Sequence, residues 1–162
     1  MGMSEGLDIK QIRDYLNART GKMVHRVIAS LQYIGEEVVN QIRNSDISYW
    51  DDHTGNLRSS IGYIVSLDGQ PIGMSGFEQV EGPQAEGAPA DGGDKGKQYA
   101  RHIATLYPQG ISLIVVAGME YASYVENIKS RTVLAQGEIV AKKMVSEMIQ
   151  KLDKRYGKND TD

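Results

Sequence analysis

The residues best suited to chemistry in this chain are Asp51, Asp52 and His53, three consecutive side chains that can each bind a divalent metal ion. Such a site would serve a metal-dependent hydrolase or nuclease, in which the ion activates a water molecule. Three neighbouring residues on a turn rarely point at one ion, and no further carboxylates recur at a helpful spacing. We therefore interpret this cluster as a turn beside a solvated helix end, with metal-dependent hydrolysis as the alternative function.

Two other features resemble catalytic or binding motifs only superficially. The segment Gly92–Lys97 is glycine-rich like a phosphate-binding loop, but Asp91 stands where the first glycine belongs and Gln98 replaces the magnesium-binding Ser or Thr. We interpret this segment as a flexible linker. His25 and His102 have no nearby Ser or Asp pattern that would form a nucleophile relay, so we expect both to be structural. The sequence thus predicts no catalytic residue, no metal ligand and no cofactor.

Composition restricts the classes of partner. The 162 residues fit one domain, and 40% hydrophobic with 24% charged residues is ordinary for a globular protein. A net charge of -3 argues against general binding to nucleic acid or to an anionic membrane. Cysteine is absent, which excludes disulfides, zinc–thiolate sites and thiol nucleophiles. No apolar run approaches the length of about 20 residues that crosses a bilayer.

Helical periodicity marks both ends of the chain. A stripe of apolar residues from Val24 to Ile42 predicts a long helix, and a shorter helix from Ile9 is expected before it, with a break or bend at Thr20-Gly21. Near the other end, Thr132 is the expected N-cap of a last helix, and Gly157 its left-handed C-cap. A short helix carrying Tyr121 and Tyr124 is expected before that helix.

The middle of the chain has the period of two that is typical of strands. Alternation predicts a strand over 60–67, and Asp68-Gly69 favours a hairpin turn after it. The apolar run Ile111–Ala117 predicts a central strand that is covered on both faces. Weak strands are expected around 72–80 and 103–107. Residues 69–98 are interpreted as a flexible loop insertion, with Glu81–Lys97 mobile in the isolated chain and ordered against a partner.

These elements predict an α+β fold in a single domain over residues 1–162. A small antiparallel sheet is expected to pack against a long N-terminal helix and a C-terminal helix, with helices over one face and a long mobile loop inserted between strands. Residues 157–162 are expected to be a frayed tail. The side chains expected to contact another subunit or partner lie around the turn and the second aromatic cluster: Trp50, Leu57, Arg58, Tyr121 and Tyr124. For Arg58, an internal anchor of the turn is an equally good interpretation.

Two short motifs carry a resemblance to a known family. Thr54-Gly55-Asn56-Leu57-Arg58-Ser59-Ser60-Ile61 resembles the Thr-Gly-x-Leu-Arg-x-Ser-Ile signature that follows the long helix in a family of siphophage minor tail components. The segment from Val116 to Glu126 resembles the second signature of that family, a strand that ends in Gly and is followed by Tyr-Ala-x-Tyr-Val-Glu. After Glu126 the chain departs from the family, since its Gly-Thr pair and Pro-Phe-Leu segment are replaced by 127–134.

The resemblance implies a structural virion protein of a phage or prophage, made in the host bacterial cytoplasm and assembled into the virion. Proteins of that family act in head–tail joining or tail completion and are not known as enzymes. The implied partners are other copies of the chain, in a homo-oligomeric ring, and other tail or head-completion proteins. Neither a membrane nor a specific nucleic acid is implied.

Overall fold

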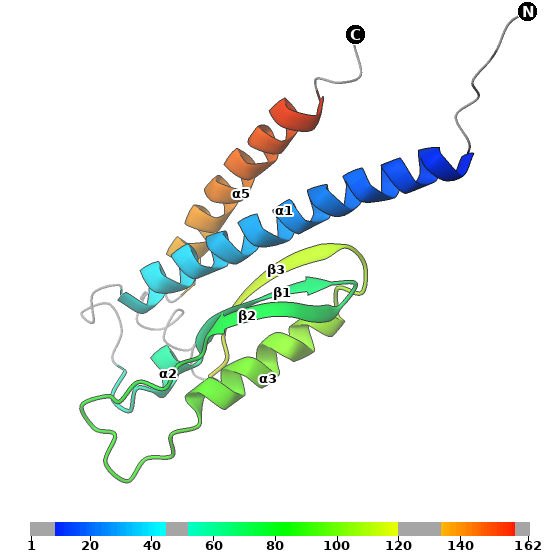
Figure 1. The fold of residues 1–162 in the computed structure, drawn as a ribbon. Helices are drawn as coiled ribbons and strands as arrows, with labels where there is room; N and C mark the ends of the chain where they lie inside the picture. The colour runs from blue at the N-terminus through cyan, green and yellow to red at the C-terminus, as the bar shows by residue number, and fades with distance from the viewer. Residues whose placement is uncertain (1–8, 45–51, 120–133, 158–162) are drawn as a thin grey trace, which may run out of the picture.

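The structure is a computed structural model, and it describes residues 9–44, 52–119 and 134–157. It confirms the α+β class: a long N-terminal helix, a small antiparallel sheet and a C-terminal helix (Figure 1). In chain order the elements are α1 (Ile9–Asn44), α2 (Asn56–Ser59), β1 (Ile61–Leu67), β2 (Gln70–Gly76), α3 (Gly92–Thr105), β3 (Ile111–Ala117) and α5 (Ala135–Tyr156). None of the helices in these ranges is both long and apolar enough to span a membrane.

Helix α1 is a single helix of 36 residues, so the prediction of a break at Thr20-Gly21 is wrong. One glycine in a helix interior costs only about 1 kcal/mol, which is less than the cost of nucleating a second helix. A Cβ added at Gly21 would meet no atom within 4 Å, so this glycine serves no close contact. The fully buried residues of α1 begin at Leu31, and Val27 is partly buried against the same core.

The sheet has the strand order β2-β1-β3, with both pairings antiparallel. The predicted hairpin at Asp68-Gly69 is confirmed: both residues have positive φ, 50° and 77°, as a tight two-residue turn requires. The prediction that Ile111–Ala117 is the central strand is wrong, because β3 lies at an edge and β1 is central. Continuous apolar sequence was the misleading signal, since glycine and serine on β1 are buried as fully as its aliphatic residues.

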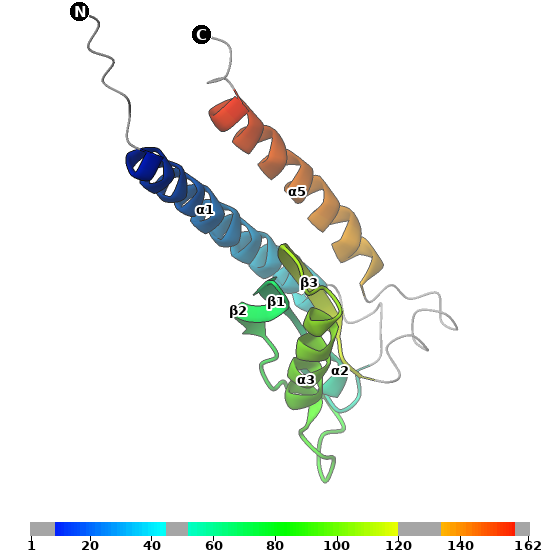
Figure 2. The same cartoon turned by 90° about the vertical axis from the view of Figure 1, so that its right-hand side faces the viewer.

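Both faces of β1 are covered by helices, which corrects the prediction that helices lie over one face only (Figure 2). On one face Ile61, Tyr63 and Val65 belong to a core formed with α1. On the other face Ile64 packs with Phe77 and the alanines of α3. The sheet is therefore the middle layer of three. Helix α5 lies beside α1, on the same side of the sheet as α1.

Helix α3 occupies sequence that was interpreted as loop and strand. Residues 92–97 form its first turns, so the flexible-linker interpretation of Gly92–Lys97 is wrong, and so is the strand expected at 103–107. The predicted loop insertion over 69–98 is wrong at both ends: β2 occupies the first part of this range, and α3 begins at Gly92. Apart from Gly69 in the hairpin turn, only 77–91 of this range remain without a helix or strand.

Helix α5 runs antiparallel to α1. Gly137 near its start faces Ile42 and Val38, and the hydroxyl of Tyr156 near its end accepts a hydrogen bond of 2.9 Å from Arg26 Nη1. Gly157 has a φ of -78°, so the predicted left-handed cap is wrong. The expected N-cap at Thr132 and the short helix around Tyr121 and Tyr124 lie outside the described residues.

Candidate functional site

The Asp52 carboxylate closes the turn that precedes β1. Its Oδ1 accepts a hydrogen bond of 3.2 Å from the backbone N–H of Leu57, and its Oδ2 accepts one of 2.9 Å from that of Arg58. Asp52 is 9% exposed, and both of its oxygens point at the start of α2. The expected turn is present, but Asp52 is buried beside the start of α2 instead of solvating a helix end, and its carboxylate holds donors that this short helix leaves unpaired.

The same turn fastens the long connection between β2 and α3. The Ser59 hydroxyl donates to the carbonyl of Gly55 at 2.7 Å and accepts from the N–H of Val80 at 2.8 Å. The Asn56 amide donates to the carbonyl of Pro89 at 2.7 Å, and the N–H of Gln84 donates to the carbonyl of His53 at 2.7 Å. Residues 77–91 are therefore attached to the turn at several points along their length.

Glycines allow α3 to approach this turn closely. A Cβ at Gly96 would lie 2.7 Å from the ring of Phe77, and one at Gly118 would lie 2.5 Å from the Cα of Gly96. Gly92 and Gly93 face the backbone of Asn56 and of Phe77 in the same way. The glycine-rich segment is thus a helix start built for backbone contact. Its sequence signal was the repetition of glycine at spacings of one and three residues, which places several on one side of a helix.

Of the residues expected to contact a partner, two are described. Leu57 is completely buried in the core, which leaves it no surface to offer a partner. Arg58 is half-buried, and its backbone N–H is one of the two that Asp52 holds. Trp50, Tyr121, Tyr124 and Asp51 lie outside the described residues.

Arg43, which sequence reasoning missed, ties α1 to the start of the 77–91 connection. Its Nη2 donates to the carbonyl of Glu78 at 2.9 Å, and its Nη1 lies 3.6 Å from the Glu78 carboxylate. Arg43 is 9% exposed. Its position at the end of the predicted helix was visible in the sequence, but nothing there indicated that the guanidinium turns inward.

No three His, Cys, Asp or Glu side chains within the described ranges lie close enough together to hold a metal ion. His53, His25 and His102 are exposed and lie on three different elements. The turn thus does not bring the histidines together.

Tyr63 is the described residue whose ionisation the fold changes most. Burial raises the pKa of its phenol to about 12, and the nearby Glu36 carboxylate adds to this effect. The hydroxyl lies 3.2 Å from Glu36 Oε1, so it donates a hydrogen bond that the neutral phenol alone can make. This contact secures α1 against the central strand and keeps the phenol protonated.

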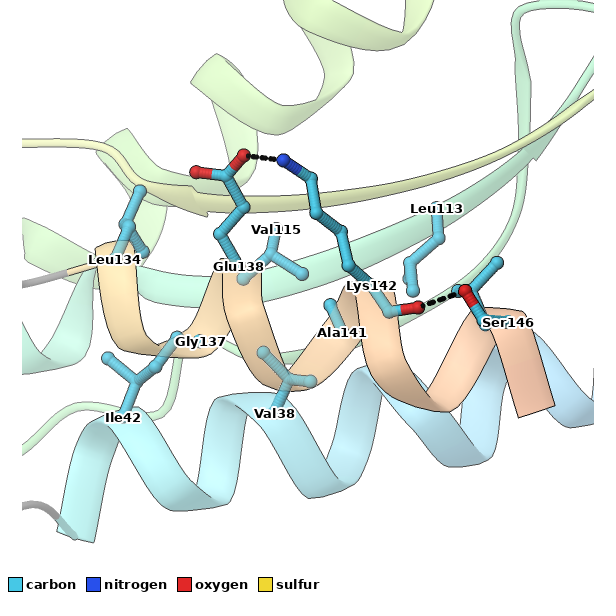
Figure 3. A pocket seen from close by; sticks show the side chains of 11 residues that line it. Val38, Ile42, Leu113, Val115, Leu134, Gly137, Glu138, Ala141, Lys142 and Ser146 are labelled. Carbon is cyan, nitrogen blue, oxygen red and sulfur yellow. Dashed lines mark hydrogen bonds and ion pairs between the residues drawn. The ribbon is translucent and has the colours of Figure 1, made fainter. Parts of the chain in front are cut away.

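The layer formed by α1 and α5 contains an open groove, whereas the residues around the Asp52 turn are closely packed. A groove of about 640 Å³ runs between α5, α1 and the edge strand β3 (Figure 3). Its lining is largely apolar: Val38, Ile42, Leu113, Val115, Leu134, Gly137, Ala141 and Val145. An exposed ion pair between Glu138 and Lys142, 2.6 Å long, lies at its rim (Figure 3). Gly137 is the single fully buried residue of α5, and the apolar residues that follow it are half-buried against the core: Val140, Ala141, Met144, Val145 and Met148.

The N-terminal part of α1 presents a second unfilled apolar surface. We call Ile9, Ile12, Leu16 and Met23 the exposed stripe; they are 74%, 43%, 54% and 40% exposed. Their spacing continues the stripe that farther along α1 packs on the sheet. Exposed apolar residues that gather on one face mark sites of protein–protein contact more often than scattered ones do.

Comparison with known proteins assigns no family: no family model, curated protein or solved structure matches the chain. We therefore infer its function from the described geometry and from the two sequence motifs. Geometrically, the Asp52–Ser60 turn is a structural device, while the open surfaces lie on α1 and α5.

Proposed function

We propose that this chain is a structural virion protein of a phage or prophage, a tail-completion or head–tail joining subunit that assembles into a ring at the tail–head interface. The observation that carries the proposal is the exposed stripe on a helix that continues past the fold. Burying such side chains against another subunit would gain about 25 cal/mol per Å² of apolar area removed from water.

The contacts of the first motif support a structural role for the segment that resembles the siphophage family. Gly55 has a φ of 82°, which favours glycine, and Leu57 fills the core. The hydroxyls of Ser59 and Ser60 each donate a hydrogen bond of 2.7 Å to a carbonyl of the same turn. Each of these motif residues thus contributes to building the turn, as expected of a motif that preserves a shape for assembly.

Self-association and particle binding test the proposal together. Light scattering at high protein concentration, with negative-stain imaging, should show rings or closed oligomers, and the protein should bind tail tubes of the virus whose genome encodes it. Portal, capsid and tail-tube genes beside the coding sequence are expected. A strict monomer that also fails to bind tail tubes would contradict the proposal.

The competing hypothesis, a metal-dependent hydrolase or nuclease at Asp51, Asp52 and His53, has less support. Both oxygens of Asp52 accept backbone hydrogen bonds, and releasing them for a metal would leave two N–H groups of α2 unpaired. This hypothesis predicts that Mn²⁺ or Mg²⁺ raises the Tm, because a ligand that binds only the native state stabilises it. An unchanged Tm at millimolar metal would dispose of it.

A further inference from the structure

The exposed stripe lies on a helix face that the rest of the described chain leaves uncovered. Helix α5 meets α1 at Arg26 through Tyr156, near the end of α5, and the residues of α1 before that contact project past the sheet (Figure 1). The stripe has the same helical phase as the buried residues Leu31, Ile34 and Val38. The face that forms the core at one end of α1 is therefore presented to solvent at the other end.

Basic residues flank this stripe. Arg13 and Arg19 lie on its two sides at the 100° per residue of an α-helix, and Lys22 lies farther around on the side of Arg19. Asp14, the single acid between Ile9 and Met23, falls on the opposite side of the helix. A partner for this face therefore needs apolar surface bordered by negative charge.

The connection over residues 78–91, which we call the acidic segment, has this character. It contains Glu78, Glu81, Glu86 and Asp91 and no Lys or Arg. Glu81 and Glu86 are exposed, and so are Pro83, Pro89 and Ala90, which supply uncharged surface in the same segment. Hydrogen bonds to His53 and Asn56 fix the segment before any partner arrives, so little ordering entropy would be lost on binding.

The two surfaces lie at opposite ends of the molecule in both views, the start of α1 at one end and the acidic segment at the other (Figures 1 and 2). One chain cannot join them to each other, but a second copy can. Pairing two exposed stripes with each other would instead bring Arg13 and Arg19 against like charges. A contact between two different surfaces propagates from subunit to subunit and closes into a ring when the rotation allows.

We propose that the exposed stripe of one subunit docks on the acidic segment of a second copy, head to tail. Arg13 and Arg19 then face Glu81 and Glu86 of the neighbour, and the apolar side chains of the stripe cover its proline- and alanine-containing surface. This interface rests on the proposed ring function and names the surfaces that would form the ring.

Disulfide trapping tests the pairing directly, because the natural chain has no cysteine. Arg13→Cys and Glu86→Cys are made as separate proteins, and Lys143→Cys, on the exposed side of α5, is the control. Under mild oxidation, the mixture of Arg13→Cys with Glu86→Cys should form a mixed dimer at least about tenfold faster than either protein mixed with the control. Cross-linking of Arg13→Cys mainly to itself would overturn the inference.

Charge reversal gives an independent test by sedimentation velocity at low salt. Arg13→Glu with Arg19→Glu, or Glu81→Lys with Glu86→Lys, should each weaken self-association about tenfold or more, and combining all four should restore most of it. Glu37→Lys with Glu147→Lys changes the net charge as the second pair does, but on exposed positions of α1 and α5, and should leave association unchanged. Equal weakening by this control pair, or no recovery in the fourfold variant, would overturn the pairing.

The outcomes separate this interface from the proposed function. Rings that form normally in both charge-reversed pairs would refute the head-to-tail contact and leave the ring function standing. A chain that stays monomeric at every concentration and gives no mixed disulfide would refute the contact. The proposed function would be refuted only if that monomeric chain also failed to bind tail tubes.

Discussion

The turn around Asp52 and the layer of α1 and α5 are built in opposite ways. At the turn, glycines bring backbones together, and the hydroxyls of Ser59 and Ser60, the Asn56 amide and the Asp52 carboxylate all have partners within the chain. In the helical layer, the core-facing apolar residues of α5 are half-buried, a groove of about 640 Å³ remains open, and α1 continues past the fold (Figure 1). The difference suggests that the turn is complete in the isolated subunit, whereas the helical layer leaves apolar surface for assembly.

The largest effect is expected at Gly55. Its φ of 82° disfavours any side chain, and an added Cβ would meet the carbonyl of Val80. We expect Gly55→Ala to lower the free energy of unfolding by about 3 kcal/mol or more. Gly21→Ala is the matched control: with no atom nearby, it should raise stability by about 0.5–1 kcal/mol. Urea unfolding of both variants measures this, and equal effects would remove the distinction between the two regions.

The same substitution in the two layers sharpens the comparison. Ala100 is fully buried between α3 and the sheet, so Ala100→Leu should destabilise the fold by about 2–3 kcal/mol through overpacking. Ala141 lines the open groove, where added methyl groups have room, and Ala141→Leu should change stability by less than about 1 kcal/mol. Thermal and urea unfolding measure both variants. A larger loss at Ala141 would show that the groove is closed in solution.

Removing the Asp52 carboxylate should have an intermediate effect. Asp52→Ala leaves the N–H groups of Leu57 and Arg58 without their acceptor, at a cost of about 2 kcal/mol. Asp14→Ala, at an exposed position of α1, should stay within about 0.5 kcal/mol of the natural chain. Full stability of Asp52→Ala would show that the two hydrogen bonds of this carboxylate do not stabilise the turn.

The smallest expected effect on stability is that of ionising Tyr63, and it should be measurable only at alkaline pH. The fold raises the pKa of Tyr63 from 10.0 to about 12, so between these values the unfolded chain releases a proton that the folded chain keeps. This contribution to stability is fully present below pH 10 and is lost as the pH rises towards 12. Urea unfolding across this window should show a steeper decline for the natural chain than for Tyr63→Phe. Parallel declines would contradict the pKa shift.

Periodicity predicted the elements that obey one simple pattern. The stripe on α1, the alternation of β1 and the Asp68-Gly69 turn were readable because each follows from local backbone geometry. Helix α3 was missed because glycines, which disfavour helices locally, are needed there for contact with Asn56 and Phe77. The order of the strands was missed for a related reason: Gly62 and Ser66 look unsuited to a central strand until the helices on both faces are known.

The candidate site was less predictable than the fold. The sequence predicted a turn over 51–56 between a helix and a strand, but not that Asp52 holds the start of α2 or that Arg43 reaches Glu78. Those contacts join residues that are far apart in the chain, and no local pattern encodes them. Helical periodicity predicted an apolar face on α1. Only the structure shows which part of that face is packed against the fold and which part is exposed.

Hydrogen–deuterium exchange of the free subunit and of the assembled particle tests the central claim most directly. We predict that 52–67 exchange slowly in both states, whereas 9–25 and 78–91 exchange faster than 52–67 in the free subunit and slow markedly on assembly. Unchanged exchange in 9–25 and 78–91, or new protection confined to the Asp52–Ser60 turn, would contradict it.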